Sequence, residues 1–380
     1  MENLFNLFDI SLILWALFTF TQLVFLAIVA VNVHSVISPS GNPIQTPLVS
    51  VLIPLRNESD NVNDLIQTLT QQDYPNLEIL LLDDQSEDDT WLKLLSMQWL
   101  HPTLLLYQGK ALPEGWLGKN FACHQLADKA RGQLLLFMDA DVRLKPNAIS
   151  AAVAILEQQQ LDFMSVFPHQ KTKTPYQNQI LPLMDFFLYT FLPFPCIRKL
   201  PSPAFTAANG QWMLFTQKAY EMSGGHEAIK NKVIEDMAIA KNIKQKGLRM
   251  NTFTGSELIQ CLMYPDDKSL KTGFGKNIFA AAGYSAFKLL TFLTFLFVVF
   301  ISPYIWFPFY SLGIINIFII LTIRVLLARK FKHQMKEALL LHPIALWKGI
   351  QLAIASMQQY SRNNASWKGR PLNTSQSIKS

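Results

Sequence analysis

Short apolar runs alternate with amphipathic stretches between Leu48 and Asp141, and this pattern limits the possible folds more than any other feature. Apolar runs bounded by polar residues are typical of strands buried on both faces of a parallel sheet. The stretches between them space their apolar residues as one face of a helix does. Strands alternating with helices predict βαβ units with right-handed crossovers. We therefore expect an α/β domain with a mostly parallel sheet flanked by helices, and its first strands at 48–55, 77–84, 103–107 and 133–141.

Polar clusters stand where three of these predicted strands end. They are PLRNES at 54–59, DDQSEDD at 83–89 and DAD at 139–141. Ligands bind outside the carboxyl ends of strands in open α/β sheets, so we expect the three clusters to face one crevice. Asp139 and Asp141 suit a hard cation, Mg²⁺ or Mn²⁺, held between the two carboxylates and a phosphate.

Familiar nucleotide motifs are incomplete in this sequence. No Gly-x-Gly-x-x-Gly follows a strand, which argues against a dinucleotide site. The Gly-Lys pairs at 118–119 and 275–276 lack the first glycine and the Ser or Thr of a P-loop. Zinc-finger spacing, RNA-binding aromatic motifs and basic recognition helices are also missing, so we expect no nucleic-acid partner. The alternating pattern predicts a nucleotide-binding type of architecture, which alone assigns no function.

Apolar segments outside the alternating region predict an integral membrane protein. Residues 10–33 carry no charge and exceed the ~20 residues that cross a bilayer. No Lys or Arg precedes them, which favours an uncleaved anchor over a signal peptide. A second apolar block at 289–323 is long enough for two passes. The expected domains are an N-terminal anchor at 1–45, the α/β domain at 46–286, a transmembrane hairpin at 287–328 and a basic tail at 329–380.

Basic residues predict the orientation in a cell membrane. The N-terminal tail lacks Lys and Arg, whereas the segments after the first and third predicted passes are rich in them, so the α/β domain and the tail are expected in the cytoplasm. Anionic lipid headgroups would balance the net charge of +6. Residues 338–357 are apolar but interrupted, which favours an interfacial or re-entrant helix, with a true pass as the alternative. Residues 177–201 are also expected at the interface, because a pass there would divide the site between two compartments.

Five motifs stand in the α/β region. They are VSVLIPLRNES, LLLDDQSEDDT, GWLGKNFACHQLADKARGQLLLFMDADV, NGQWMLFTQKAYEMSGGHE and VIEDMAIAKNI. These motifs resemble those of glycosyltransferase family 2, whose members have the GT-A fold, and the resemblance covers roughly residues 48–265. The layout of anchor, catalytic domain and hairpin, together with the tail SWKGRP, is similar to membrane glycosyltransferases that act on carotenoid- or hopanoid-type lipids.

The resemblance implies an inverting transfer of sugar from a nucleotide-sugar donor, such as UDP-glucose, to a lipid acceptor. Asp139 and Asp141 would bind the metal, and Lys119 begins a helix whose start can bind a phosphate, although a surface lysine is nearly as plausible. Asp236 would be the general base, beside Glu235, whose charge can tune its pKa. The remaining candidates are Pro54, Arg56, Asn57, Glu58, Asp83 and Asp84 on the donor side with Asp139, and Asn209, Gly210, Gln211, Gly224, Gly225 and His226 on the acceptor side. For His226 a structural place in a turn is the plainer interpretation.

One motif departs from the family pattern. Processive members carry Gln-x-x-Arg-Trp, but the corresponding run QCLMY has Met263 and Tyr264 in the last two positions. This difference favours transfer of a single sugar, and it leaves the departing diphosphate one cation short. Candidate replacements are Lys268, Lys271 and Lys276.

The intact IED motif at 234–236 predicts an acceptor hydroxyl, because an alcohol needs a base and an ionised carboxylate does not. A sugar ester is the less favoured product. Three other functions stay open: a processive polysaccharide synthase of the same family, a membrane-anchored nucleotidyltransferase, and a membrane scaffold or transporter without catalysis.

Overall fold

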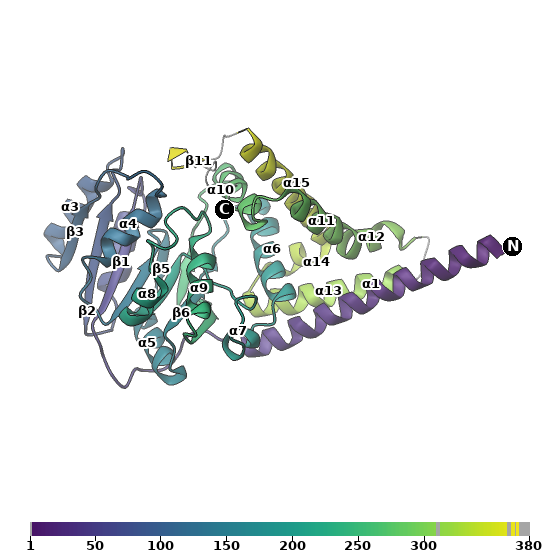
Figure 1. Cartoon of the computed structure of the whole chain (residues 1–380), viewed down its shortest axis with the longest axis horizontal. Helices are drawn as coiled ribbons and strands as arrows, with labels where there is room; N and C mark the ends of the chain where they lie inside the picture. Colours follow the sequence, from purple (N-terminus) through teal and green to yellow (C-terminus); the bar gives the residue numbers. More distant parts are fainter. Residues whose placement is uncertain (1, 309–311, 363–365, 369, 372–380) are drawn as a thin grey trace. The chain divides into compact units, whose positions relative to one another are not determined.

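The chain forms two compact units in the computed structural model (Figure 1). The structure describes residues 2–308, 312–362, 366–368 and 370–371. A sheet unit combines Val36–Lys171, Pro195–Met263 and Ala365–Ser380, and a helical unit combines Met1–Ser35, Thr172–Phe194 and Tyr264–Asn364. Each unit is described separately below.

A seven-stranded, mostly parallel sheet is the centre of the sheet unit. Strands β1, β2, β3 and β4 are mutually parallel, as are β6 and β9, whereas β8 runs antiparallel to both of its neighbours. The α/β architecture predicted from the alternating runs is confirmed, and the antiparallel strand lies beyond the part that the runs described. In sheet order the strands are β3 (Leu104–Gln108), β2 (Leu77–Asp83), β1 (Val49–Leu55), β4 (Leu134–Met138), β8 (Trp212–Thr216), β6 (Phe163–Phe167) and β9 (Met250–Thr254).

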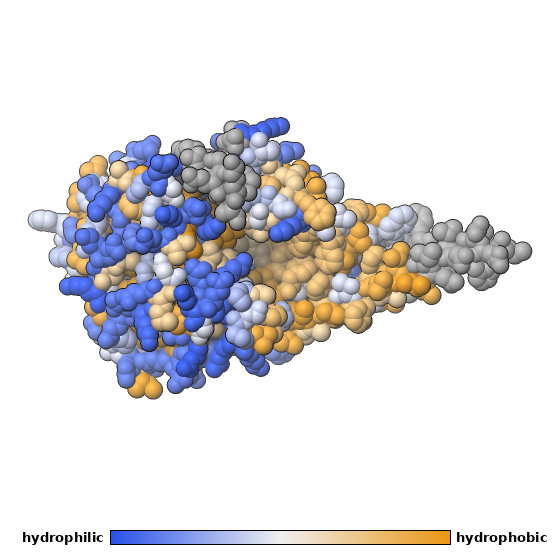
Figure 2. All heavy atoms as spheres, viewed as in Figure 1, coloured by the Kyte–Doolittle hydropathy of each residue, from blue (hydrophilic) through white to orange (hydrophobic). Residues whose placement is uncertain are grey.

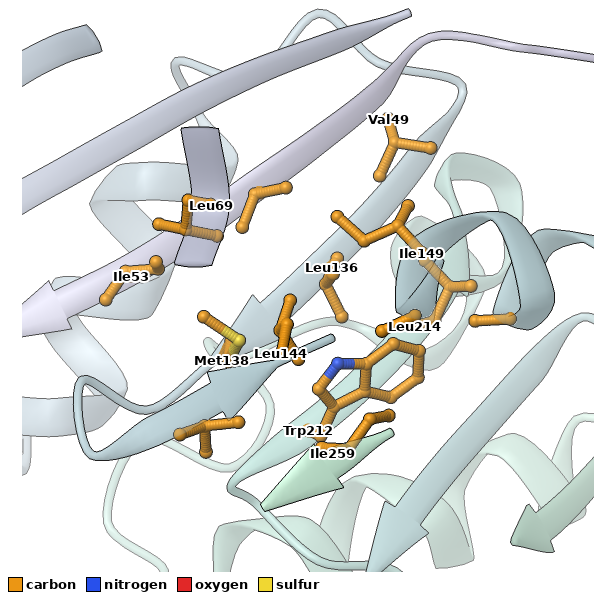
Figure 3. Close-up of a cluster of buried hydrophobic side chains, with 14 of the residues drawn as sticks. Val49, Ile53, Leu69, Leu136, Met138, Leu144, Ile149, Trp212, Leu214 and Ile259 are labelled. Carbon is orange, nitrogen blue, oxygen red and sulfur yellow. The ribbon is translucent and has the colours of Figure 1, made fainter. Parts of the chain in front are cut away.

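Helices cover both faces of this sheet, which explains why its central strands are apolar without alternation. Leu136 of β4 belongs to a buried cluster with residues of β1, α2 and α5, with Trp212 of β8 among them (Figure 3). The next residue, Phe137, has its ring centroid 5.7 Å from that of Phe215 and 5.2 Å from that of Tyr220. Adjacent residues of one strand therefore fill two different cores. The helices are α2 (Val62–Thr70), α3 (Thr90–Leu100), α4 (Gly118–Ala127), α5 (Ala148–Gln159), α7 (Pro195–Lys199), α8 (Gln217–Ser223) and α9 (Glu235–Gln245).

Two smaller sheets belong to the same unit. A three-stranded sheet follows the end of β4 and contains β5 (Val142–Leu144), β10 (Ile259–Cys261) and β7 (His169–Gln170). A two-stranded hairpin near the C-terminus pairs β11 (Ser366–Trp367) with β12 (Arg370–Pro371) in antiparallel fashion.

The helical unit joins segments that are far apart in the sequence. Polar side chains bind across it: Gln22 Nε2 donates to the carbonyl of Val299 (2.7 Å), and Asn316 Nδ2 donates to Gln22 Oε1 (2.9 Å). Figure 1 shows α1 running alongside α13, and Figure 2 shows hydrophobic side chains over much of the visible face of this unit. The helices are α1 (Glu2–Ser35), α6 (Pro175–Phe191), α10 (Asp267–Ala281), α11 (Ala286–Leu296), the π-helical segment η1 (Phe297–Ile301), α12 (Ser302–Trp306), α13 (Leu312–Phe331), α14 (Met335–Leu340) and α15 (His342–Ser361).

Within the described residues, two helical segments are long and apolar enough to cross a membrane, Leu12–Ser35 and Ala286–Trp306. The first falls in the predicted anchor and the second in the first half of the predicted hairpin. The second pass of that hairpin falls mainly on α13, which is not one of these two segments. The domain bounds and the interfacial placement of 177–201 and 338–357 stay predictions.

Candidate active site

The three polar clusters predicted at strand ends meet at one edge of the sheet. β1 lies between β2 and β4 and is parallel to both, so their carboxyl ends share an edge. The Asp84 amide donates to the carbonyl of Leu55 (2.7 Å), which ties the end of β2 to the end of β1. The chain beyond these strands therefore brings Glu58, Asp84 and Asp139 into one region.

Arg56 and Asn57 hold this edge together. The Arg56 guanidinium is buried and donates to the carbonyls of Asp84 (2.8 Å) and Gln85 (2.5 Å). Asn57 has a φ of 51°, and its side-chain oxygen accepts from the Glu87 amide (2.8 Å). Through these hydrogen bonds, both residues stabilise the turn after β2. Pro54 lies inside β1, opposite Leu82 in the register.

Asp83 and Asp84 keep unused acceptor atoms inside this turn. Their side chains are 5% and 2% exposed. In both, Oδ1 is buried and has no hydrogen-bond partner among the described residues. Burial raises the pKa of Asp84, although Arg370 beside it acts in the opposite direction. Buried polar atoms are normally satisfied, so a bound group with hydrogen-bond donors is expected here.

Asp139 and Asp141 follow the last residue of β4, and the position fits a divalent cation. Asp141 Oδ1 is buried and lacks a hydrogen-bond partner among the residues that the structure describes. Burial, followed by the charges of Asp139 and Glu58, raises the pKa of Asp141 to about 7. The described part of the chain contains no cluster of three or more His, Cys, Asp or Glu side chains arranged around one point. One or two carboxylates completed by substrate phosphates are the usual protein share of a Mg²⁺ site.

We expect Mn²⁺ or Mg²⁺ with UDP to raise the melting temperature of the protein, because the cation relieves the unpaired charge at Asp141. A ligand at a hundredfold excess over its Kd adds about 2.7 kcal/mol to the free energy of unfolding. Differential scanning fluorimetry measures this shift without any turnover. The Asp141→Asn variant should lose it, whereas Asp128→Asn, at an exposed position, should keep it. An equal shift in both variants would contradict the assignment.

Lys119 links Asp139, after β4, to Glu235, at the start of α9. Its ammonium lies 2.8 Å from Asp139 Oδ1 and 2.9 Å from Glu235 Oε1. It stands in the first turn of α4. Burial opposes its charged form, but the charges of Asp139 and Glu235 outweigh burial and raise the pKa of Lys119. A Cβ on Gly210 would lie 2.8 Å from Glu235 Oε1 and 3.2 Å from Lys119 Nζ. The bridge therefore needs glycine at position 210, and Lys119 is not an ordinary surface lysine.

Replacing Lys119 with Met should destabilise the protein, because two partly buried carboxylates would lose their shared cation. Hydrogen bonds to charged groups contribute ~1.5–3 kcal/mol each, so we expect a loss of about that size in the free energy of unfolding. Thermal or chemical unfolding measures the loss. Lys129→Met, at an exposed position just after the end of the same helix, is the matched control and should change little. Equal stability of the two variants would contradict the bridge.

Asp236 is held by two backbone amides and has a raised pKa. Its Oδ2 accepts from the Gly210 amide (2.9 Å) and its Oδ1 from the Met237 amide (2.7 Å). Burial and then the charge of Glu235 raise the pKa of Asp236 to about 7, while these hydrogen bonds and Lys119 oppose the rise. A carboxylate with a pKa near neutrality is suited to general base catalysis.

The predicted acceptor-side residues fall into two groups. Asn209, Gly210 and Gln211 lie beside Asp139 and Asp236, since the Asp139 amide donates to the Gln211 carbonyl (3.1 Å). Gly224, Gly225 and His226 instead form a turn after α8, where the His226 ring hydrogen-bonds the Tyr220 hydroxyl (2.9 Å). Burial lowers the pKa of His226 to about 3, so the ring is neutral. The plainer interpretation of His226 as a turn residue agrees with these contacts.

Sequence reasoning missed two cations at the strand ends. Lys368 pairs with Glu58, and Arg370 Nη1 lies 2.6 Å from Asp84 Oδ2. Both come from the C-terminal hairpin. The pair of basic residues around a glycine in SWKGRP was a signal, but nothing in the sequence connects it to β1 and β2.

Known proteins are similar to this chain in sequence and in fold. The profile described as Glycosyl transferase family 2 matches residues 50–221. The chain therefore carries a stretch that is similar to glycosyltransferase family 2. The 4,4'-diaponeurosporenoate glycosyltransferase of Staphylococcus haemolyticus is 28% identical over 243 residues, which are 62% of each chain. The protein of the same name from Staphylococcus aureus (strain USA300) is 25% identical over 250 residues, 64% of each chain. The match thus spans less than two thirds of these relatives.

A solved glycosyltransferase supports the GT-A fold of this chain. The mannosyltransferase of Pyrobaculum calidifontis in complex with GDP-Man and Mn²⁺ superposes with a TM-score of 0.56. The superposition covers 92% of this chain and 97% of that chain, at 17% identity. The motifs predicted the resemblance to family 2 and the GT-A fold, and the layout and the SWKGRP tail predicted the similarity to carotenoid glycosyltransferases. All three predictions are confirmed.

Proposed function

We propose that this protein is an inverting glycosyltransferase that moves one sugar from a UDP-sugar, such as UDP-glucose, to an isoprenoid lipid. The observation that carries the proposal is the cluster at the end of β4 and the start of α9. There, Lys119 bridges Asp139 and Glu235, with Asp141 and Asp236 beside them. The cluster combines carboxylates that fit a divalent cation with a carboxylate that fits a base.

In the proposed reaction, an acceptor hydroxyl oxygen attacks the anomeric carbon from the side opposite the diphosphate. Asp236 takes the hydroxyl proton as the new carbon–oxygen bond forms. The bond from the anomeric carbon to the diphosphate oxygen breaks, and UDP leaves with the electron pair, so the anomeric configuration inverts. Mg²⁺ or Mn²⁺ at Asp139 and Asp141 would neutralise the charge that develops on the leaving diphosphate. The Gly210 and Met237 amides hold Asp236 in place for the proton transfer.

The curated relatives support an isoprenoid acceptor, since their printed names are those of carotenoid glycosyltransferases. The same names also favour a second candidate, because diaponeurosporenoate is a carboxylate. Transfer to a carboxylate would give a sugar ester and would need no base. The raised pKa of Asp236 supports the hydroxyl acceptor that the IED motif predicts.

The membrane location of the acceptor is part of the proposal. The apolar segments Leu12–Ser35 and Ala286–Trp306 support an integral protein, and the basic flanks support a cytoplasmic catalytic face. A donor made in the cytoplasm and a lipid held in the bilayer would then meet at the cytoplasmic surface.

The reaction products test the proposal against a nucleotidyltransferase. The purified full chain is incubated with Mn²⁺ and a lipid extract, together with either a panel of UDP-sugars or UTP and sugar phosphates. The proposed enzyme releases UDP from one UDP-sugar, and only when lipid is present. Pyrophosphate released from UTP would show a nucleotidyltransferase instead, and a chain that turns over neither mixture would support a non-enzymatic function.

A further inference from the structure

The C-terminal hairpin places two cations on the edge of the sheet where β1 and β2 end. Lys368 Nζ donates to the carbonyl of Arg56 (2.7 Å) and pairs with the Glu58 carboxylate. Arg370 Nη1 donates to Asp84 Oδ2 (2.6 Å), and Nη2 donates to Gln85 Oε1 (3.0 Å). The Arg56 guanidinium in turn donates to the Lys368 carbonyl (3.2 Å). The hairpin and both strand ends belong to the same compact unit.

Arg370 also lies against the first residue of α4. A Cβ on Gly118 would be 2.6 Å from Arg370 Nη1 and 3.1 Å from Asp84 Oδ2. The amides at the start of a helix attract anions, and Lys119 follows in the same turn. Beside them, the buried Oδ1 atoms of Asp83 and Asp84 have no hydrogen-bond partner among the described residues. The place therefore offers cations and the start of a helix for an anion, next to acceptors for a group with N–H or O–H donors. A nucleoside diphosphate has both kinds of group.

A diphosphate bound beside these carboxyl groups would need more cations than the strand ends supply. Glu58, Asp84, Asp139 and Asp141 place four carboxyl groups there, and a diphosphate would add further negative charge. Lys119 is shared between two carboxylates, and Arg56 is occupied with backbone carbonyls and Glu87.

The lysines that the sequence suggested as replacements, at 268, 271 and 276, lie on α10 in the helical unit. Within the sheet unit, the C-terminal hairpin adds two cations, Lys368 and Arg370.

We propose that the C-terminal hairpin is part of the donor site, and that Arg370 and Lys368 bind the diphosphate of the nucleotide donor. This inference rests on the proposed function. The hairpin takes the place of the cation that Met263 and Tyr264 do not provide. When the donor binds, the two side chains exchange part of their contacts with Asp84 and Glu58 for phosphate oxygens. The planar Arg370 guanidinium suits two phosphate oxygens at once, and Lys368 acts as a point charge.

Binding of UDP and of uridine to the full chain tests this inference, measured by calorimetry in the presence of Mn²⁺. The variants are Arg370→Ala, Arg370→Lys and Lys368→Gln. The matched control is Arg362→Ala, which removes the same charge from an exposed position at the end of α15. Melting temperatures are measured for all of them, and Arg370→Lys keeps the charge if the alanine variant is unstable.

We expect Arg370→Ala to weaken UDP binding about 10- to 100-fold and to leave uridine binding within about threefold. Arg370→Lys should fall between the alanine variant and the wild type. In steady-state assays KM for the UDP-sugar should rise by a similar factor, with a smaller change in kcat. The Arg362→Ala control should match the wild type in every measurement.

Three results would overturn the inference. UDP affinity equal to that of the wild type in Arg370→Ala, Arg370→Lys and Lys368→Gln would remove the hairpin from the donor site. Tighter UDP binding in Arg370→Ala would show that the hairpin blocks the site. Equal losses for uridine and UDP would assign Arg370 to the nucleoside or to the turn itself. In all three cases the wild type remains an active transferase, whereas a wild type without any affinity for UDP would overturn the proposed function as well.

Discussion

Replacing Asp141 with alanine should reduce sugar transfer by about 10³-fold or more, because the departing diphosphate would lose its metal. A bound cation contributes several kcal/mol of charge stabilisation, and each 1.36 kcal/mol corresponds to about a factor of ten in rate. Asp141 is suited to this task because its Oδ1 is buried without a partner among the described residues. The protein should remain folded, since removing a crowded carboxylate also relieves repulsion from Asp139 and Glu58.

Turnover with saturating UDP-sugar and Mn²⁺ measures this effect, and EDTA should have the same effect on the wild type. Asp128→Ala, which removes an exposed aspartate, is the matched control and should keep full activity. Wild-type turnover that persists in EDTA would rule out the metal, and an active Asp141→Ala variant would move the metal elsewhere.

Replacing Asp236 with asparagine should reduce turnover by about 10²- to 10⁴-fold while UDP binding stays near normal. Asparagine has the same size and keeps an oxygen for the Gly210 or Met237 amide, but it cannot accept the acceptor proton. The size of the loss also reports the acceptor, since an ionised carboxylate gains little from a base. A variant that turns over at the wild-type rate would mean that Asp236 is not the base or that the product is a sugar ester.

The pH dependence gives an independent check on Asp236. A carboxylate acts as a base only when it is ionised, and the pKa of Asp236 is raised to about 7. For the wild type, kcat/KM should therefore rise with pH, level off above about 7 and be about tenfold lower one unit below the pKa. Saturating Mn²⁺, bound as proposed, would keep the nearby Asp141 ionised during the measurement. If the same inflection persists in Asp236→Asn, another group is responsible for it.

The strand ends could be predicted because the information for them is local. The run LLLFM followed by Asp-Ala-Asp predicts both the buried strand β4 and the carboxylates after it. Parallel pairing of β4 with β1 then brings the Asp139 cluster toward the other strand ends without any knowledge of side-chain contacts.

Contacts between distant segments could not be predicted from patterns of this kind. Arg370 reaches Asp84 across 286 positions, and a short polar tail has no periodicity that would reveal such a partner. The shared cation between Asp139 and Glu235 also depends on the close approach of Gly210, which only coordinates show. From the sequence alone, Arg56 could equally have faced a ligand. Its hydrogen bonds to the carbonyls of Asp84 and Gln85 depend on the conformation of the turn after β2.

Mass spectrometry of lipid products is the most direct test of the proposed transfer of one sugar to the hydroxyl of an isoprenoid lipid. Purified full-length protein is incubated with Mn²⁺, a panel of UDP-sugars and isoprenoid lipids that end in a hydroxyl or a carboxylate, with Asp141→Ala as the inactive control. We expect one new lipid species that is heavier than its acceptor by a single sugar residue. The sugar should be joined through the hydroxyl oxygen, and the species should be missing from the control. A ladder of species with successive added sugars, or no glycosylated lipid from any donor, would contradict the proposed transfer.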